Sequence, residues 1–406
     1  MQPQIEIFSQ GEEVVTGQIV DTNAAWLSQQ LVDMGFAVKR HTAVGDDLQD
    51  LKTLLNEISQ RSDCCICTGG LGPTIDDLTA KAVAQAFERP LQLDPVALQQ
   101  ISAHYTRRKR VMADVNRKQA FFPQGSERID NDWGTAPGFA VQQNRCWFAF
   151  VPGVPSEMKA MFNEKLAPIL LQRFSLQPDR LVTLRSVGIG ESDLQEKLNK
   201  IQLPDNVQLG FRAVTDEVQT KLIFPAEIEQ PQVQMIVNQV AESIGDFVFA
   251  IDNRHGEQGG LIEAIDRLMI QERYSLFVQE SISQGLIAAK TIARPWLTAS
   301  AFCQSFAKLA EKLEVHIDEG NYLKVAENCA LKIKQQEKTD LVLVQMYRGS
   351  TEQVQQKTQN IELYNVLLTP DGIRTSVSTI GGPVKRKQNQ AAILALDLLR
   401  RYLQKK

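Results

Sequence analysis

Short apolar segments alternate with amphipathic ones over the first 87 residues, and this alternation constrains the fold more than any other feature of the chain. Apolar runs of strand length occupy 5–9, 37–42 and 63–68, and segments with helical periodicity occupy 24–34, 48–60 and 78–87. Strands that alternate with helices on short connections favour a parallel sheet covered by helices on both faces. We therefore predict an α/β fold for this part of the chain.

Residues 68–79, Thr-Gly-Gly-Leu-Gly-Pro-Thr-Ile-Asp-Asp-Leu-Thr, join the third predicted strand to the third predicted helix. Glycines allow a backbone to approach a ligand closely, and the free N–H groups at a helix start favour an anion. Asp76 and Asp77 would repel a phosphate unless a cation such as Mg²⁺ lay between them. The segment therefore predicts a phosphate-plus-metal site. The alternative is a tight turn in which Asp76 or Asp77 caps the helix.

A second polar stretch, 11–23, follows the first predicted strand. Ligands of parallel sheets bind beyond the carboxyl ends of the strands, and both polar stretches fall at such ends. This coincidence favours the functional interpretation. The region 95–118 is predicted to be helical and basic, with Arg107-Arg108-Lys109-Arg110 and Asn116-Arg117-Lys118. These charges indicate either a solvated helix face or contacts with a nucleotide phosphate.

The composition is that of an ordinary soluble globular protein, with 406 residues, 43% hydrophobic and 23% charged, enough for two to four domains. The net charge of −4 provides no general attraction for nucleic acid. No apolar run approaches the ~18 residues of a membrane span, and no signal peptide is visible. Cys65 and Cys67 share a strand face and could chelate a metal, but buried thiols in a reducing cytoplasm are the favoured interpretation of the six cysteines.

A different pattern begins at residue 180. Strands are expected at 180–186, 207–212 and 219–224 and helices at 191–200 and 233–244, which together form a small α+β module. Its turn, Gly188-Ile189-Gly190-Glu191, loosely resembles the loop of nucleic-acid-binding KH modules, but the nearby acidic residues argue against phosphate clamping. A polar linker is expected at 253–260. Strands at 274–279, 341–346 and 366–368 and helices at 286–292 and 388–404 are expected beyond it.

Ser281 follows a predicted strand and could act as a nucleophile if a base activated it. No histidine lies in a pattern typical of a Ser-His-Asp triad, but Lys308, on a predicted helix, could serve as the base if burial lowered its pKa. The alternative is structural: Ser281 or Ser283 caps the following helix, and Lys308 is solvated.

Four segments carry a family resemblance: 11–23, 68–79, 134–138 and 152–158. With these segments, in this order, the chain is identified as a member of the competence/damage-inducible CinA family, and it resembles the YfaY-type branch described as nicotinamide mononucleotide amidohydrolase-like. The resemblance implies an α/β chain of three parts. They are a MoaB/Mog-like (molybdopterin-binding-like) three-layer domain over 1–174, a KH-type α+β module over 178–252, and an α/β CinA C-terminal domain over 257–406.

The resemblance also implies that the N-terminal domain hydrolyses the pyrophosphate of ADP-ribose, or of a related nucleotide, with a divalent cation (Mg²⁺, Mn²⁺ or Co²⁺). In this hypothesis the diphosphate lies on Gly69, Gly70 and Gly72. The cation is held by Asp76, Asp77 and Asp21. The nucleotide is oriented by Thr22, Asn23, Thr74 and Asn116. The family further implies a cytoplasmic homodimer that acts on small nucleotides in NAD recycling.

The C-terminal domain resembles nicotinamide mononucleotide deamidases, with departures. Where the family has E-S-C-T-G-G, this chain has Glu280-Ser281-Ile282-Ser283-Gln284-Gly285. The family element Y-x-N-x-x-K keeps its lysine as Lys308, but Cys303 replaces its tyrosine. The glycine-rich family segment T-G-x-A-G-P-x-G-G has no counterpart near 344–349. We therefore expect little or no deamidase activity, with Ser281 and Lys308 as remnants. The alternatives are a non-catalytic nucleotide- or pterin-binding regulatory protein, or a deamidase for which Ser281 and Lys308 suffice.

Overall fold

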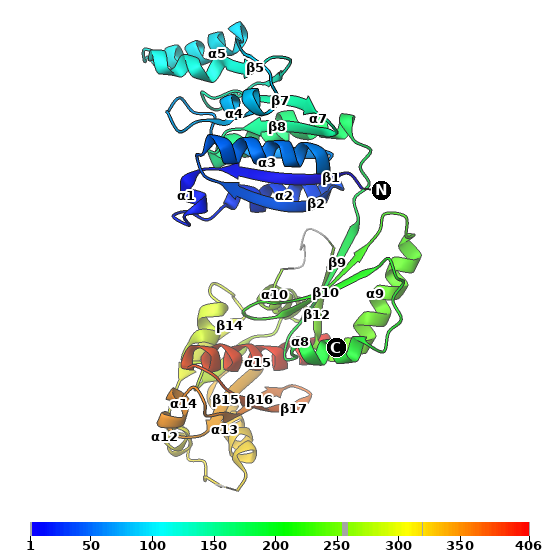
Figure 1. The fold of residues 1–406 in the computed structure, drawn as a ribbon. Coiled ribbons are helices and arrows are strands. Elements are labelled where there is room, and N and C mark those ends of the chain that lie inside the picture. Colours follow the sequence, from blue (N-terminus) through cyan, green and yellow to red (C-terminus); the bar gives the residue numbers. More distant parts are fainter. Residues whose placement is uncertain (1, 254–258, 319, 406) are drawn as a thin grey trace. The chain divides into compact units, whose positions relative to one another are not determined.

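A computed structural model describes residues 2–253, 259–318 and 320–405 (Figure 1). The chain forms two compact units, Met1–Asp179 and Arg180–Lys406, and each is described by itself. The predicted linker at 253–260, with the predicted domain start at 257, lies mostly outside the described residues. Within the described ranges, no helix combines the length and the apolar character that a membrane crossing requires.

The first unit is built on a six-stranded sheet with the order β2-β1-β3-β8-β7-β6. Strands β2, β1, β3 and β8 are parallel to one another, whereas β7 is antiparallel to both of its neighbours, β8 and β6. The predicted parallel sheet is therefore confirmed, with an antiparallel edge in addition. The strands are β1 (Gln4–Gln10), β2 (Ala37–Val44), β3 (Cys64–Thr68), β6 (Glu127–Ile129), β7 (Gly138–Gln143) and β8 (Cys146–Val151), and β4 (Leu91–Leu93) pairs separately with β5 (Phe121–Pro123).

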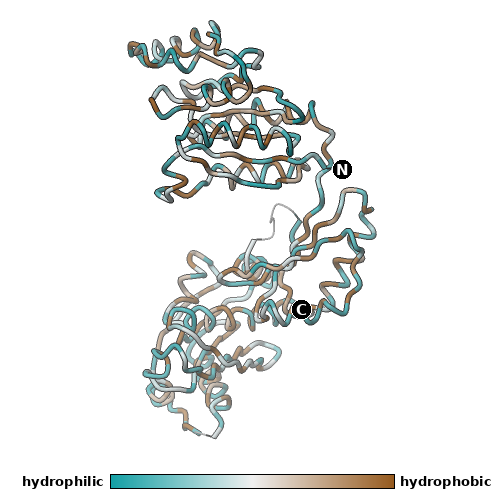
Figure 2. The backbone as a smooth tube through the Cα atoms, viewed as in Figure 1, coloured by the Kyte–Doolittle hydropathy of each residue, from teal (hydrophilic) through white to brown (hydrophobic). Residues whose placement is uncertain are grey.

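Helices cover both faces of this sheet, which confirms the three-layer architecture. One apolar core joins the sheet to α3, α4 and α5, and the other joins it to α2, α6 and α7. In Figure 2 the helices change colour along their length, as helices with one buried face do. The helices are α1 (Glu12–Val15), α2 (Thr22–Met34), α3 (Leu48–Arg61), α4 (Thr79–Ala86), α5 (Pro95–Arg107), η1 (Asp114–Ala120), α6 (Pro155–Met161), η2 (Phe162–Leu166) and α7 (Ala167–Arg173).

The strand order defines where a ligand can bind. The chain passes from β1 to β2 on one side and then returns to place β3 on the other side of β1. The crevice at such a reversal, beyond the carboxyl ends of the strands, is the usual ligand position in open α/β sheets. In this structure it lies beyond β1 and β3. The polar stretch that follows β1 contains the four-residue helix α1.

The second unit contains two sheets. The first is antiparallel, with the order β10-β11-β9-β12, and the second has the order β14-β13-β15-β16-β17, of which β14, β13 and β15 are parallel. The predicted strand pair at 207–224 is confirmed, β14 and β17 were not predicted, and β16 is much longer than the predicted 366–368. The strands are β9 (Arg180–Ser186), β10 (Gln208–Ala213), β11 (Val218–Phe224), β12 (Val248–Asn253), β13 (Leu276–Glu280), β14 (Leu297–Phe302), β15 (Leu341–Arg348), β16 (Ile361–Thr369) and β17 (Gly372–Ile380).

Helices α8 and α9 pack on the first of these sheets, whereas the second is covered by α10 and α15 on one face and by α12 and α13 on the other. The KH-type nature of the smaller module stays a prediction. The helices are α8 (Glu191–Leu198), α9 (Gln230–Ile244), η3 (Gly245–Phe247), α10 (Leu261–Glu272), α11 (Leu286–Lys290), α12 (Phe306–Lys312), α13 (Tyr322–Gln336), α14 (Thr351–Gln355) and α15 (Val384–Gln404).

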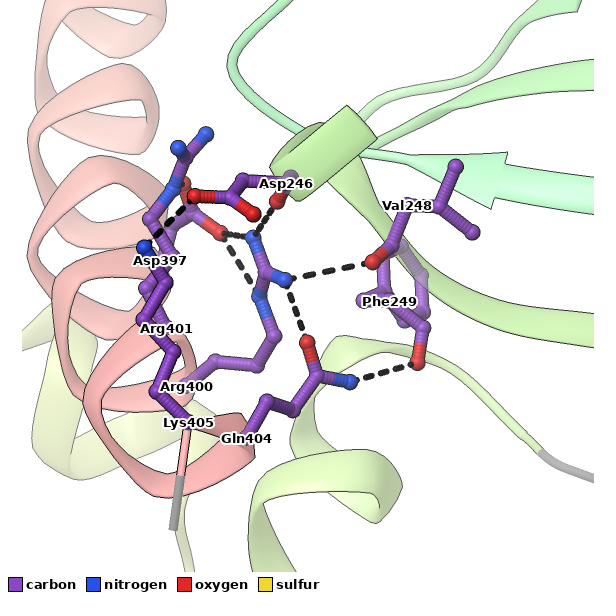
Figure 3. A network of polar contacts seen from close by, with 8 residues as sticks. All are labelled: Asp246, Val248, Phe249, Asp397, Arg400, Arg401, Gln404 and Lys405. Atoms are coloured by element: carbon purple, nitrogen blue, oxygen red, sulfur yellow. Dashed lines mark hydrogen bonds and ion pairs between the residues drawn. The ribbon is translucent and has the colours of Figure 1, made fainter. Parts of the chain in front are cut away.

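The two sheets of the second unit share one apolar core. Val187, Phe249 and Ala250 of the smaller module lie in the same buried cluster as residues of α10 and α15. A polar network beside this core adds directional contacts between the parts (Figure 3). The smaller module therefore has an apolar core of its own and also packs against the C-terminal part within this unit.

Arg400 of α15 is the centre of that network and is only 1% exposed. Its guanidinium donates to the Asp397 carboxylate (2.9 Å), to the Val248 carbonyl (3.2 Å) and to the Asp246 carbonyl (2.7 Å), as Figure 3 shows. Burial lowers the pKa of Arg400, and the charge of Asp397 opposes that shift. Asp397 therefore compensates a cation that water does not reach.

The cysteines are buried thiols, as predicted, except that Cys303 is half-buried. All six are free, and the Sγ atoms of Cys65 and Cys67 lie 3.7 Å apart inside the sheet. Burial raises the pKa of both of these thiols and raises the pKa of Cys329 to about 11. These groups are therefore protonated and unreactive near neutral pH.

We expect Asp397→Ala to destabilise the second unit by about 3 kcal/mol, because it leaves a buried guanidinium without its counter-charge. Denaturant unfolding of the full chain measures this change. The matched control is Lys405→Ala, which removes the neighbouring ion pair with Asp246 (2.7 Å), whose partners are 67% and 56% exposed. That exposed pair should contribute less than about 1 kcal/mol. Equal effects of the two variants would contradict the role given to Arg400.

Candidate functional site

A cavity of about 510 Å³ lies at the carboxyl ends of β1, β3 and β8. The two predicted polar stretches meet there, together with the segment that follows β8. The structure therefore brings three segments that are distant in the sequence to one site. The lining residues are Gln10, Gly11, Glu13, Asp46, Gly69, Gly70, Leu71, Gly72, Pro73, Asp76, Asp77, Gln119, Thr135, Ala136, Pro152, Gly153, Val154 and Glu157.

Glycines are needed where the turn after β3 crosses the end of β1. Gly69 has φ +96° and Gly70 has φ +63°, in the region that side chains rarely adopt. A Cβ atom on Gly69 would lie 2.2 Å from the Gln10 carbonyl oxygen, and one on Gly70 would lie 2.2 Å from the Gln10 side-chain oxygen. The Gly69 N–H donates to the Val151 carbonyl (3.1 Å), which ties the turn to β8.

Asp77 holds the glycine-rich loop together. Its carboxylate accepts hydrogen bonds from the backbone N–H of Gly72 (2.7 Å) and of Thr74 (2.7 Å), and also from the Thr74 hydroxyl. The alternative in which Asp76 or Asp77 caps the following helix is wrong, because α4 begins after Leu78 without a side-chain cap. Asp77 closes the loop on itself.

Asp76 points to solvent at the rim of the cavity and is exposed. A hydrogen bond with the side chain of Thr74 lowers the pKa of Asp76, so the carboxylate is ionised near neutral pH. Five carboxylates line the cavity, and no lysine or arginine is among the described residues that line it. An anionic ligand in such a site requires a cation to offset the repulsion. Mg²⁺ suits this donor set, because it is usually held by one or two carboxylates and by substrate phosphates.

The third residue of the predicted cation set lies elsewhere. Asp21 does not line the cavity but caps α2, where its carboxylate accepts a hydrogen bond from the Ala24 N–H (2.8 Å). Among the residues that the structure describes, no three His, Cys, Asp or Glu side chains gather as a metal cluster. The set of Asp76, Asp77 and Asp21 therefore does not form here as a preassembled centre.

The residues predicted to orient a nucleotide are not among those that line the cavity. Asn23 is buried, and its side-chain amide donates to the Gly153 carbonyl (2.7 Å), so it positions a segment of the cavity wall. Asn116 does not line the cavity, because its amide oxygen accepts from the Tyr105 hydroxyl (2.9 Å) and its nitrogen donates to the Ala113 carbonyl (3.1 Å). Thr22 is exposed at the start of α2 and does not line the cavity either.

The second predicted site does not bring its two residues to one cavity. Lys308 lines a hollow of about 980 Å³ beyond the carboxyl ends of β14 and β15, with Cys303, Tyr347 and Arg348 among its other lining residues. Ser281 does not line it. Its side chain is buried, and among the described residues its hydroxyl has no hydrogen-bond partner.

The loop after β13 is held by Glu280, which sequence reasoning did not single out for this role. The carboxylate of Glu280 is fully buried and accepts from the Ser283 hydroxyl (2.6 Å) and from the N–H groups of Ile287 (3.1 Å) and Ala288 (3.1 Å). Capping of α11 by Ser281 or Ser283 is therefore wrong. The residue before the helix is Gly285, and the first N–H groups of α11 are satisfied by Glu280.

Comparisons with known proteins agree with this architecture. The sequence model of the family described as "Probable molybdopterin binding domain" matches residues 6–172. The chain is 37% identical over 403 residues to a "CinA-like protein" of Escherichia coli O9:H4 (strain HS), an alignment that covers 98% of this chain and 94% of that protein.

The chain belongs to the CinA-like proteins.

The same identity and coverage relate it to the "NMN amidohydrolase-like protein YfaY" of Escherichia coli (strain K12). Among solved structures, the chain is similar to the protein CinA of unknown function from Thermoplasma acidophilum, at 31% identity and a TM-score of 0.39. The alignment covers 41% of this chain and 98% of the Thermoplasma chain. The predicted family is therefore confirmed over nearly the whole chain.

This CinA-like chain has a central residue in its first cavity that the sequence analysis missed. Gln10, at the end of β1, is 6% exposed and donates to the Asp46 carboxylate (2.8 Å) and the Asp76 carbonyl (3.3 Å), and it accepts from the Thr79 hydroxyl. The side chain thus joins the segments after β1, β2 and β3. The available signal was a polar residue that ends an apolar strand directly before a glycine.

Glu157 also lines the cavity, where its carboxylate accepts from the Asn131 side-chain amide (2.8 Å). Neither Glu157 nor Ser156 caps α6, because Val154 occupies the position before the helix and no side chain caps it. The turn around Asn131 and Gly134 is thereby tied to the cavity wall.

We expect Asp77→Ala to lower the unfolding free energy of the first unit by about 1–2 kcal/mol, because two backbone N–H groups of the loop lose their acceptor. Denaturant unfolding, followed by tryptophan fluorescence, measures the change. Asp76→Ala is the matched control, since this exposed carboxylate should leave the unfolding midpoint unchanged. A larger loss for Asp76→Ala than for Asp77→Ala would contradict the structural role of Asp77.

Proposed function

We propose that the first unit hydrolyses the pyrophosphate bond of a small nucleotide such as ADP-ribose, with a divalent cation. The observation that carries this proposal is the cavity lining, which combines a glycine-rich turn with five carboxylates and has no basic side chain among its described residues. A phosphate would not enter this carboxylate-lined cavity without a cation.

Asp76 is the residue best placed to hold that cation, since it is exposed at the rim and its backbone is fixed by Gln10. The carboxylate of Asp46, oriented by the same glutamine, is the second candidate ligand. The cation would offset charge on the leaving phosphate and activate a water molecule. Asp77 supports the reaction by keeping the loop closed, and Asn23 does so by fixing the segment around Gly153.

The backbone contributes the contacts to the diphosphate. The N–H groups of Gly69 and Gly72 already donate to Val151 and Asp77, so these glycines serve to shape the turn. Gly70 and Leu71 lie between them and form the part of the loop that faces a phosphate in this proposal. The second candidate function is binding of a nucleotide or pterin without turnover, and the family description "Probable molybdopterin binding domain" favours it.

We expect the purified full chain to release AMP from ADP-ribose with Mg²⁺, Mn²⁺ or Co²⁺, and to lose that activity in excess EDTA. Asp76→Asn should reduce kcat/KM by at least about 100-fold, because it removes the charge that holds the cation. Asp50→Asn is the control, since Asp50 is exposed on α3 and does not line the cavity. Ligand-dependent melting without AMP release would favour the binding protein instead.

One relative, similar to this chain over nearly its whole length, has a name that includes "NMN amidohydrolase-like". We infer that this chain nevertheless has no such activity, because Ser281 is buried and Lys308 lines a cavity that Ser281 does not reach. The serine loop is also pinned, with Gln345 accepting from the Ser283 N–H (2.9 Å) and hydroxyl (2.8 Å). A nucleophile in this arrangement meets neither a base nor a substrate.

Accordingly, nicotinamide mononucleotide should yield no ammonia above the rate of a Ser281→Ala variant, as measured by a coupled glutamate dehydrogenase assay. The control is a known deamidase in the same buffer. Ammonia release that disappears in Ser281→Ala would show that the loop opens in solution and would overturn the inference.

A further inference from the structure

A smaller cavity, of about 100 Å³, adjoins the large one in the first unit. The two share Thr135, which lines both. The small cavity lies between the last turns of α5 and the turn that precedes β7. It has room for several water molecules, and so for one tetrahedral anion, but not for a nucleoside. Its lining residues are Gln100, Ile101, Ala103, Arg107, Asn131, Asp132, Gly134, Thr135 and Pro137.

Hydrogen bonds of Asn131 fix the segment that separates the two cavities. The Asn131 side-chain oxygen accepts from the N–H groups of Trp133 (3.0 Å) and Gly134 (2.9 Å), and its amide donates to Glu157 in the large cavity. Gly134 is required there, since a Cβ atom would lie 1.8 Å from the Glu157 carboxylate. These contacts fix Thr135 at the boundary.

The charges of the two cavities are opposite in kind. The large cavity holds five carboxylates, whereas Arg107 supplies a cation to the small one. The side chain of Arg107 makes no hydrogen bond or ion pair with any described residue. The single carboxylate in the small cavity, Asp132, is paired with Lys165 (2.9 Å). Arg107 is therefore available to an anion.

The neighbouring histidine does not compete for that anion. His104 lies one turn before Arg107 on the same helix and is 8% exposed. Burial lowers the pKa of His104, and the charges of Arg108 and Arg107 lower it further. The imidazole is therefore neutral near pH 7, which leaves Arg107 as the cation that faces the small cavity.

We propose that the small cavity is a subsite for a phosphate group of the ligand, with the Arg107 guanidinium as its cation and the Thr135 hydroxyl as a further donor. Arg107 is exposed, and its guanidinium can bind two phosphate oxygens at once. Unlike the carboxylate-lined cavity, this subsite needs no divalent cation. The inference shares a phosphate-bearing ligand with the proposed function but does not depend on hydrolysis.

The simplest alternative is that Arg107 only complements the dipole at the end of α5. Chemical protection separates the two roles within one molecule. The full wild-type chain is treated with phenylglyoxal in EDTA, with sodium phosphate or with sodium chloride at equal ionic strength, and the modified peptides are quantified by mass spectrometry. Arg108 and Arg110 are exposed, as Arg107 is, but they line neither cavity and therefore serve as internal controls.

We expect about 20 mM phosphate to slow modification of Arg107 about fivefold, which corresponds to a Kd on the order of 5 mM, and to leave Arg108 and Arg110 unchanged. Thr135→Val should reduce the protection while the melting temperature stays the same. Displacement by AMP would identify a nucleotide phosphate as the natural occupant, whereas indifference to AMP would identify free phosphate. Equal protection of all three arginines, or protection of none, would overturn the subsite whether or not AMP is released from ADP-ribose.

Discussion

The contact between the turn at Gly69 and the end of β1 is the constraint on which the first unit depends. The backbone after β3 passes so close to Gln10 that no side chain fits at Gly69 or Gly70. β1 and β3 are adjacent parallel strands at the point where the strand order reverses. The contact between the turn and β1 therefore lies at the crevice in which ligands of open α/β sheets bind. Gly69 and Gly70 thus allow the turn to pack on β1, and the same two residues line the cavity.

Most of this architecture was predictable because it depends on local pattern. Apolar periodicity and glycine-rich turns predicted the strands, the helices and the two stretches that meet in the cavity. The functions of individual carboxylates were not predictable in the same way. Asp77 and Asp21 look like ligands in the sequence, but each accepts hydrogen bonds from nearby N–H groups of its own segment. Only the folded geometry separates a carboxylate that closes a loop from one that faces a ligand.

Long-range contacts explain the remaining differences. Gln10 contacts Asp46 and Asp76, which lie 36 and 66 positions later in the chain. Its place at the end of an apolar strand, directly before a glycine, is a local signal, but that pattern does not identify these distant partners. Ser281 and Lys308 are candidates for a nucleophile and a base in the sequence. In the structure, the buried Glu280 carboxylate holds the loop between β13 and α11 by accepting hydrogen bonds from Ser283 and Ile287. The sequence pattern predicted only part of the second unit, because β14 and β17 were not found in it, and the separation of the two predicted site residues follows from packing.

The shared core of the second unit also limits how the protein can be divided. Val187, Phe249 and Ala250 are buried against α10 and α15, and Arg400 donates to the carbonyls of Asp246 and Val248. A fragment that ended near residue 252 would expose this apolar surface and leave those carbonyls unsatisfied. The chain is therefore best divided near residue 179, at the boundary between the two compact units, because a division between the smaller module and the C-terminal part would leave an exposed apolar surface on both fragments.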